Sequence, residues 1–147
     1  MLISLTKSAD TLTNIFGKSS SVSIGTQNSC WLGLFTTAPQ SNGTGGVEVG
    51  SGKNYARVEI HGVMSVTNRK ATNSSDINFN PAINPADPSA ASGYDWGTIV
   101  AIGLFSEATG GTPYAWGNLD TSVSVTTKTS FHILTGDLEV NLTESAS

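Results

Sequence analysis

The sequence predicts an all-β protein, an antiparallel sandwich or barrel-like domain with one short N-terminal helix. Charged residues make up only 12% of the 147 residues. The polar surface must therefore come from Ser, Thr, Asn and Gly, which favour turns and disfavour helices. Apolar residues recur in short runs between Gly- and Pro-rich stretches, as strands do between turns. A chain of this length can bury an adequate core without disulfides or a metal, so we expect a single domain over residues 1–147.

One helix is expected near the N-terminus, at about residues 8–16. Apolar residues follow helical spacing there, at Leu5, Ala9, Leu12 and Phe16. The helix would either plug one end of the β structure or dock on a neighbouring subunit. Because docking stays open, Leu12 and Phe16 are candidate interface residues.

The strongest strand signal in the first half of the chain is the apolar run over residues 30–36. Such a run predicts a central strand buried on both faces. Cys30, the only cysteine, opens it and cannot form an internal disulfide. We interpret Cys30 as a small buried hydrophobe, with a nucleophile or an intermolecular bridge as the alternatives. A long Gly-rich loop over residues 40–52 follows.

A second strand is predicted over residues 55–61, where polar and apolar residues alternate. This alternation would place Ala56, Val58 and Ile60 on one buried face. Residues 63–66 can continue the strand. The stretch that follows, residues 67–75, is polar, and residues 76–79 alternate again as a short strand.

Residues 81–95 contain three prolines and read as a long irregular loop. Loops of this length are uncommon in compact domains and usually carry function or form contacts. Four residues in or next to this loop are therefore candidate interface residues: Pro85, Pro88, Tyr94 and Trp96.

The second half of the chain is densely β. Residues 97–105 and 113–119 predict a hairpin joined by a glycine-containing turn at residues 108–112. Residues 131–134 and 137–142 predict the closing strands.

Two pairings between distant residues are expected. Gly33-Leu34-Phe35 recurs as Gly103-Leu104-Phe105, so these two strands could pair at the centre of a sheet. Trp96 and Trp116 flank the hairpin and could meet across it, as cross-strand aromatic pairs do. Packing is the main interpretation of the tryptophans, with a subunit interface or a ligand contact as alternatives.

The charge pattern argues against two classes of partner. The net charge is −4 and the seven Lys and Arg residues are scattered, whereas nucleic-acid binding needs a basic surface. No stretch approaches the ~20 apolar residues of a membrane helix. The N-terminus lacks the basic start and apolar core of a secretory signal, so none is expected.

No set of residues predicts catalysis, a metal site or a cofactor. His61 and His132 lack ligands at metal-binding spacing. Ser130, His132 and Asp137 lie close in sequence, but no nucleophile elbow accompanies them. Four loop carboxylates could serve glycoside hydrolysis only if the fold paired them: Asp87, Asp95, Glu107 and Asp120. The sequence therefore predicts a non-enzymatic protein.

The order of motifs resembles the small tail-fibre-like or accessory virion proteins of tailed bacteriophages. The resemblance covers about residues 5–142. It rests on an apolar N-terminal helix, Trp31-Leu32-Gly33-Leu34-Phe35-Thr36-Thr37-Ala38-Pro39, Tyr55-Ala56-Arg57-Val58, Asp95-Trp96-Gly97-Thr98-Ile99, Gly103-Leu104-Phe105, Ala108-Thr109-Gly110-Gly111, Ala115-Trp116-Gly117-Asn118-Leu119 and Gly136-Asp137-Leu138. The chain departs from the family pattern in its longer loop at residues 81–95.

The resemblance implies a virion structural protein, assembled in the bacterial cytoplasm, that acts through protein–protein contacts. Capsid decoration and a tail or fibre component are both compatible with it. We expect a homo-oligomer, with a trimer favoured, bound to other virion proteins. The alternative is a receptor- or carbohydrate-binding adhesin that uses residues 40–52, residues 81–95 and Trp96 against a host-surface receptor.

Overall fold

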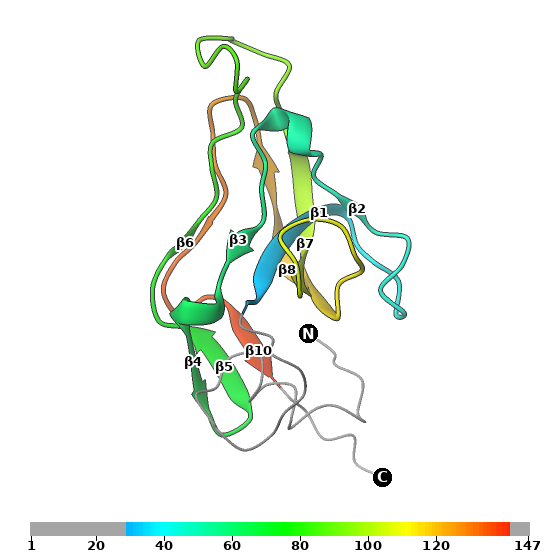
Figure 1. The fold of residues 1–147 in the computed structure, drawn as a ribbon, viewed down its shortest axis with the longest axis vertical. Helices are drawn as coiled ribbons and strands as arrows, with labels where there is room; N and C mark the ends of the chain where they lie inside the picture. The colour runs from blue at the N-terminus through cyan, green and yellow to red at the C-terminus, as the bar shows by residue number, and fades with distance from the viewer. Residues whose placement is uncertain (1–28, 142–147) are drawn as a thin grey trace.

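The computed structural model describes residues 29–141 and confirms the all-β prediction. Ten strands and two short 3-10 helices make up the regular structure of this part (Figure 1). Every strand pairing in it is antiparallel. The predicted helix at residues 8–16, with Leu12 and Phe16, lies outside the described residues.

The strands form three sheets. The central sheet has the order β2-β1-β7-β8, with β3 also paired to β1. Its strands are β1 (Trp31–Thr37), β2 (Val47–Glu48), β3 (Val58–Glu59), β7 (Gly97–Phe105) and β8 (Ala115–Val125). The second sheet has the order β10-β5-β4, from β4 (Met64–Thr67), β5 (Lys70–Asn73) and β10 (Glu139–Asn141). A ribbon pairs β6 (Ile77–Asn78) with β9 (His132–Ile133). The 3-10 helices are η2 (Ser51–Lys53) and η3 (His61–Val63).

The repeated Gly-Leu-Phe motifs do pair at the centre of the main sheet, as predicted. In the β1–β7 register Gly33 lies opposite Gly103, and Leu32 lies opposite Leu104. Because cross-strand neighbours share a face, this register divides the sheet into two faces. The inner face carries Leu32, Leu34, Ile102 and Leu104. The outer face carries Trp31, Gly33, Phe35, Ala101, Gly103 and Phe105.

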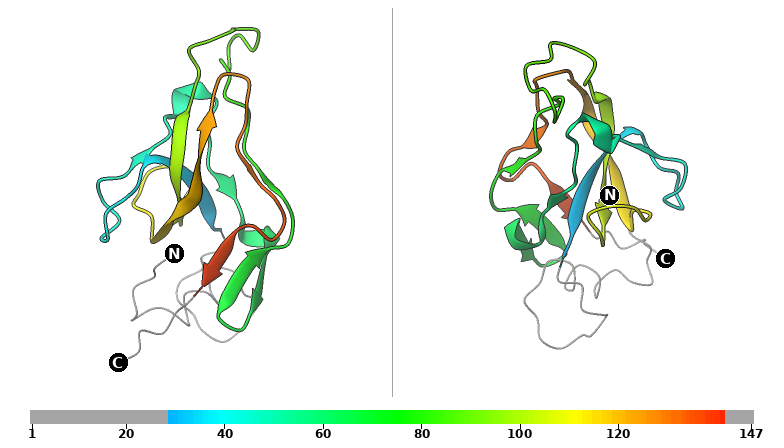
Figure 2. Two further views of the ribbon diagram at one scale, coloured as in Figure 1. Left: turned by 180° about the vertical axis from the view of Figure 1, so that it is seen from behind. Right: turned by 45° about the horizontal axis from the view of Figure 1, so that its top comes forward.

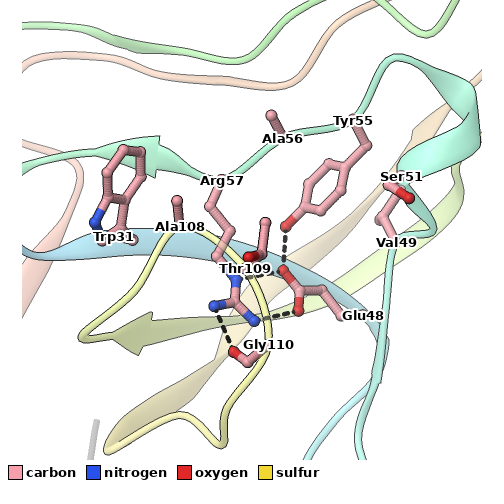
Figure 3. A pocket seen from close by; sticks show the side chains of 10 residues that line it. All are labelled: Trp31, Glu48, Val49, Ser51, Tyr55, Ala56, Arg57, Ala108, Thr109 and Gly110. Atoms are coloured by element: carbon pink, nitrogen blue, oxygen red, sulfur yellow. Dashed lines mark hydrogen bonds and ion pairs between the residues drawn. The ribbon is translucent and has the colours of Figure 1, made fainter.

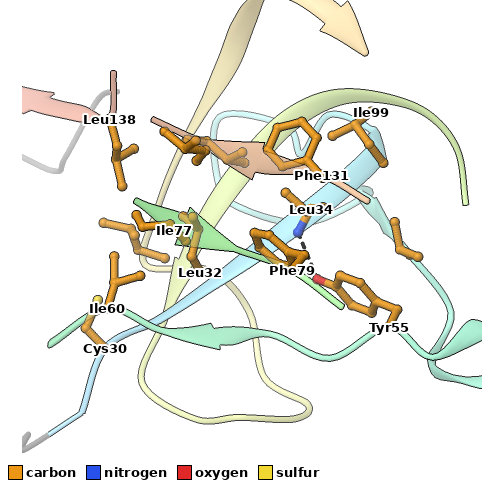
Figure 4. Packing of buried hydrophobic residues seen from close by; sticks show 14 of the residues in the cluster. Cys30, Leu32, Leu34, Tyr55, Ile60, Ile77, Phe79, Ile99, Phe131 and Leu138 are labelled. Carbon is orange, nitrogen blue, oxygen red and sulfur yellow. Dashed lines mark hydrogen bonds between the residues drawn. The ribbon is translucent and has the colours of Figure 1, made fainter. Parts of the chain in front are cut away.

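The inner face is closed by the other two sheets. Leu32 and Leu34 belong to one buried cluster with Ile77 of β6, Ile133 of β9 and Val140 of β10. Figure 4 shows Leu32, Leu34 and Ile77 within this cluster. Burial of apolar side chains from three sheets in one continuous core is the main source of stability. The prediction that the run over residues 30–36 is buried on both faces is confirmed, because residues 32–35 are all buried.

The predicted strand over residues 55–61 is wrong in extent, and its predicted buried face is confirmed only in part, because Ile60 is buried and Val58 is half-buried but Ala56 is not buried. Only Val58–Glu59 form a strand, and β4 is separated from it by η3. Ala56 is exposed, whereas Tyr55 and Arg57 are buried. The reason is that Arg57 finds an anionic partner in the interior, while the small Ala56 side chain gains little from burial.

The predicted meeting of Trp96 and Trp116 is also wrong. Strand β8 continues to Val125, so the residue before β7 lies beside the far end of β8. The Trp96 amide donates to the Val125 carbonyl, and Trp116 lies opposite Gly103. The two tryptophans are thus at opposite ends of the hairpin. The predicted packing role is confirmed for Trp96, which is 4% exposed and contacts the rings of Tyr55 and Phe79.

The polar stretch over residues 67–75 contains a strand, β5, and a buried polar residue, Asn73. Its amide group donates to the carbonyls of Ser75 and Leu134, and its Oδ1 accepts from the amides of Gly136 and Leu138. A buried amide that is satisfied on all sides fixes its surroundings in one arrangement. Asn73 thereby ties β5 to the turn before β10.

Two loops lie over the outer face of the central sheet. The 38–46 loop joins β1 to β2, and the 106–114 loop joins β7 to β8; Figures 1 and 2 show them on the side away from β6 and β9. The Pro-rich loop, residues 81–95, lies at the opposite end of the molecule from β10. Within residues 29–141, no helix is long and apolar enough to cross a membrane.

Candidate functional site

The outer face is built around two stacked phenylalanine rings. Phe35 and Phe105 lie with their ring centroids 6.0 Å apart and their planes 16° from parallel. A Cβ atom on Gly103 would come within 2.6 Å of the Phe35 ring, and one on Gly33 within 2.7 Å of the Phe105 ring. The glycines therefore let the rings lie flat on the sheet. This explains why the same three-residue motif occurs in both central strands.

A partly buried ion pair lies on top of this stack, with the Arg57 side chain 3% exposed and the Glu48 side chain 24% exposed. The Arg57 guanidinium binds both carboxylate oxygens of Glu48, through Nε at 2.8 Å and through a terminal nitrogen at 2.7 Å. Its carbon Cζ is 3.3 Å from the centroid of the Phe105 ring. Bidentate pairing and stacking on an aromatic ring are both favourable for arginine. Arg57 is thus held both by its ion pair with Glu48 and by stacking on the Phe105 ring.

The ion pair fixes the loop and strand segments around it. Arg57 donates to the carbonyls of Glu107 and Gly110 in the 106–114 loop, each at 2.8 Å. The Tyr55 hydroxyl donates to Glu48 and accepts from the Leu34 amide. Burial, together with the negative charge of Glu48, raises the pKa of Tyr55 above its ordinary range. The hydroxyl therefore stays protonated and keeps donating to Glu48.

Two hollows flank this network, and Figure 3 shows the first of them. The first, of about 390 Å³, lies between residues 55–57 and the 106–114 loop; its lining consists of Trp31, Glu48, Val49, Ser51, Tyr55, Ala56, Arg57, Ala108, Thr109 and Gly110. The second, of about 310 Å³, lies between the 38–46 and 106–114 loops over the two phenylalanines. Glu48 lines both. These volumes are at the lower end of the range of small-ligand sites.

The predicted contact residues of the Pro-rich loop have different surroundings. Pro85 and Pro88 are exposed, Tyr94 is half-buried and Trp96 is in the core. The loop is held by local hydrogen bonds, from the Ser89 amide and hydroxyl to Asp87 and from the Ala86 amide to Asn84. Its prolines are therefore presented on an ordered loop, while Trp96 packs beneath it.

Comparison with known proteins identifies the family of this chain. The family model described as Podophage GP4 fiber I protein gp80 matches residues 6–141. The chain belongs to this family. The match covers nearly the whole chain and identifies a structural component of the phage tail fibre, part of the virion and in contact with other virion proteins. No curated protein matches the sequence.

The one cysteine of this fibre-family protein, a residue type that can act as a nucleophile, has a structural role. Cys30 is fully buried and shares a 2.8 Å hydrogen bond with the Tyr114 hydroxyl. Burial raises the pKa of the Cys30 thiol to about 12, so it remains protonated at neutral pH and is a poor nucleophile. The prediction that Cys30 acts as a small buried hydrophobe is confirmed.

The histidine and carboxylate groupings that the sequence did not support as sites are also not assembled in residues 29–141. His132 is exposed, and no hydrogen bond joins it to Ser130 or Asp137 in this part of the chain. Asp87 and Asp95 each accept from the backbone and hydroxyl of a nearby loop residue, Ser89 and Thr127. Within the same residues, no group of three His, Cys, Asp or Glu side chains could hold a metal ion.

Sequence reasoning missed the polar centre of the outer face. Glu48 lies in a segment interpreted as loop, and Arg57 in one interpreted as a half-buried strand with the opposite face inward. One signal was available: Tyr55 and Arg57 are two apart, so an extended backbone places them on one face. Their partner Glu48 could not be paired with them without the fold.

Proposed function

We propose that this chain is a structural component of the phage tail fibre that acts through protein–protein contacts, without catalysis. The family match over residues 6–141 carries the proposal. The surface supports it, because a chain with only 12% charged residues can form contacts at a low desolvation cost. Capsid decoration is the alternative position in the virion.

Labelled antibodies against the chain, imaged on intact phage particles, test the position directly. The expected result is label on the tail fibres alone. Label distributed over the capsid shell would contradict the fibre assignment and favour decoration, and unlabelled particles would contradict a virion role.

We infer that the fibre unit is a homo-oligomer, with a trimer as the expected state. Leu12 and Phe16 of the N-terminal segment, and Pro85, Pro88 and Tyr94 of the Pro-rich loop, are the proposed contact residues. The exposed prolines support this, because a rigid loop loses little conformational entropy when it is bound. Trp96, buried beneath the loop, would act by holding it in place.

The mass of the full chain under native conditions tests the oligomer. A mass of three chains is expected, and it should fall to one chain when Pro85, Pro88 and Tyr94 are all replaced by alanine. Replacement of the exposed Thr121 on β8 by alanine is the matched control and should leave the mass unchanged. A monomeric wild-type chain would overturn the proposal.

A host-surface receptor is the second candidate partner. The exposed Pro-rich loop favours it, because ordered loops on rigid scaffolds commonly carry binding residues. Purified chain should then bind whole host cells, and the triple alanine variant should bind them less. Equal binding by both proteins would exclude this loop as the receptor contact.

A further inference from the structure

The first hollow on the outer face has an aromatic wall and an open entrance. The half-buried Trp31 stands at one end of it, and the Glu48 carboxylate lies on its floor (Figure 3). Two residues at the entrance, Ala56 and Ala108, are small and exposed. An apolar group of a second molecule that enters between these alanines therefore meets an indole and a carboxylate.

Trp31 has the properties of a residue that binds proline. Its side chain packs against the Phe35–Phe105 cluster, which holds it in place. Its indole N–H makes no hydrogen bond within residues 29–141. A proline offers a rigid ring and has no N–H, so a proline-rich segment presents carbonyl acceptors with few competing donors. Aromatic-lined grooves bind such segments, and an indole adds a donor for one of the carbonyls.

The Pro-rich loop carries two exposed prolines, Pro85 and Pro88, three residues apart. The shape of the loop is fixed locally, because the Ser89 amide and hydroxyl donate to Asp87. The Lys128 ammonium group donates to the Ser89 carbonyl at 3.3 Å. Rigid apolar rings on an ordered loop lose little conformational entropy when they are bound. The loop therefore presents a segment that fits the aromatic wall of the hollow.

The charges of the two surfaces are compatible. The Glu48 side chain is 24% exposed, whereas Arg57, at 3% exposed, lies behind it. A carboxylate has about four lone-pair positions, and three are used by Tyr55 and Arg57. Glu48 can thus accept one more hydrogen bond from outside the hollow. Lys128 is exposed and lies close enough to Asp87 to offset its charge, so the loop brings a cation to Glu48.

The loop of the same chain does not reach this wall. Trp31 lies opposite Phe105, the last residue of β7, whereas the Pro-rich loop joins β7 at its first residue, Gly97. The nine residues of β7 span about 26 Å. Hydrogen bonds from Thr127 to Asp95 fix the base of the loop at the far end. Prolines that pack on this indole therefore come from another chain.

We propose that Pro85 and Pro88 of one copy dock against Trp31 in the first hollow of a second copy. Lys128 of the docking copy then binds the Glu48 carboxylate of that second copy. Because the two surfaces are different, the contact is head-to-tail and closes into a ring when the rotation between copies allows it. This docking rests on the homo-oligomer proposed above and identifies the surface that the Pro-rich loop meets.

A mixing experiment with two complementary variants tests the contact. Ala56→Phe closes the hollow but keeps the loop, whereas Pro85→Ala with Pro88→Ala changes the loop but keeps the hollow. At a concentration where the wild-type chain is fully assembled, each variant alone should have the native mass of one chain. An equal mixture should give the mass of two chains, because the intact loop of the first variant fits the intact hollow of the second. Thr121→Phe, at an exposed position of β8, is the matched control and should assemble like the wild type.

The outcomes separate this contact from the oligomer itself. A monomeric wild-type chain would contradict the homo-oligomer, and the docking with it. A wild-type oligomer with Ala56→Phe still assembled would overturn the docking alone, and the hollow would then be open to a segment of another virion protein. Two monomeric variants that stay monomeric when mixed would also overturn the docking, because the contact would not be head-to-tail.

Trp31→Leu tests the aromatic wall without closing the hollow. In a chain whose circular dichroism is that of the wild type, the concentration needed for half-assembly should rise at least about tenfold. The reason is that leucine lacks both the flat face and the N–H donor of the indole. An unchanged concentration in this folded variant would contradict the role of Trp31.

Discussion

The two faces of the central sheet are built by the same two strands but are held in different ways. On the inner face, Leu34 and Leu104 pack against aliphatic and aromatic residues of two other sheets. On the outer face, Phe35 and Phe105 are covered by two loops and by the Arg57–Glu48 pair. The inner face depends on apolar area alone. The outer face depends on a few directional contacts, so it can be opened or reshaped without loss of the core.

The largest expected effect is on the inner face. Leu104→Ala removes a side chain with no exposed surface and should lower the free energy of unfolding by about 4 kcal/mol, because it leaves a cavity in a closed core. Denaturant unfolding followed by tryptophan fluorescence measures this. Val123→Ala, at a position that is 41% exposed, is the control and should cost less than about 0.5 kcal/mol. Equal costs would mean that the inner face is not the dominant core.

The next effect tests the outer face. Arg57→Ala leaves Glu48 in a largely buried site without its counter-charge and should cost about 3 kcal/mol. Loss of the hydrogen bonds to Glu107 and Gly110 should also release the 106–114 loop, which limited proteolysis would detect.

A double variant separates the charge from the packing. Arg57→Met with Glu48→Gln removes both charges and keeps an acceptor for the Tyr55 hydroxyl. It should recover much of the stability lost in Arg57→Ala, because neutral replacements of a buried ion pair are often well tolerated. If the double variant is no more stable than Arg57→Ala, the loss comes from packing on Phe105 rather than from an uncompensated charge.

A smaller effect concerns the contact between the strands and the two rings. Gly103→Ala would place a Cβ atom 2.6 Å from the Phe35 ring and should cost about 2 kcal/mol through overpacking. Adding Phe35→Leu should make the combined cost smaller than the sum of the two single costs, as coupled neighbours do. Gly50→Ala is the control, because nothing lies within 4 Å of its Cβ position and its φ is −71°. Additive costs in the double variant would show that ring and glycine do not compete for space.

This difference between the faces also explains how much could be predicted from the sequence. The apolar runs of β1 and β7 and the repeated Gly-Leu-Phe motif predicted the central pairing, because hydrophobic periodicity is a local signal. Burial of Arg57 depends on Glu48 and on carbonyls some fifty residues away, a pairing with no local signature. The candidate site was missed for the same reason, and the polar β5 was missed because Asn73 is satisfied by residues 134–138.

The smallest expected effect is a pH-dependent loss of hydrogen bonding in the Pro-rich loop, which is held by a carboxylate, but not in the 106–114 loop, which is held by a guanidinium. The 106–114 loop is anchored by the Arg57 guanidinium, which donates to the carbonyls of Glu107 and Gly110. The Pro-rich loop ends at Asp95, whose carboxylate accepts from the Thr127 amide and hydroxyl. The side-chain hydrogen bond from Thr127, followed by its backbone hydrogen bond, lowers the pKa of Asp95 below its usual value of 3.8. A lowered pKa in the folded state means a contribution that is present above the unfolded value and is lost as the pH falls through the folded one.

Amide hydrogen exchange should therefore distinguish the two anchors. Below about pH 4, the protection of the Thr127 amide should decrease once the intrinsic pH dependence of exchange is removed. The Leu34 amide, which donates to the Tyr55 hydroxyl, should keep its protection and serves as the control. Asp95→Asn keeps an oxygen acceptor without the titration, so its Thr127 amide should lose this pH dependence. Parallel loss of protection at both amides would indicate global unfolding in acid, and the two loops would then not differ in their response to pH.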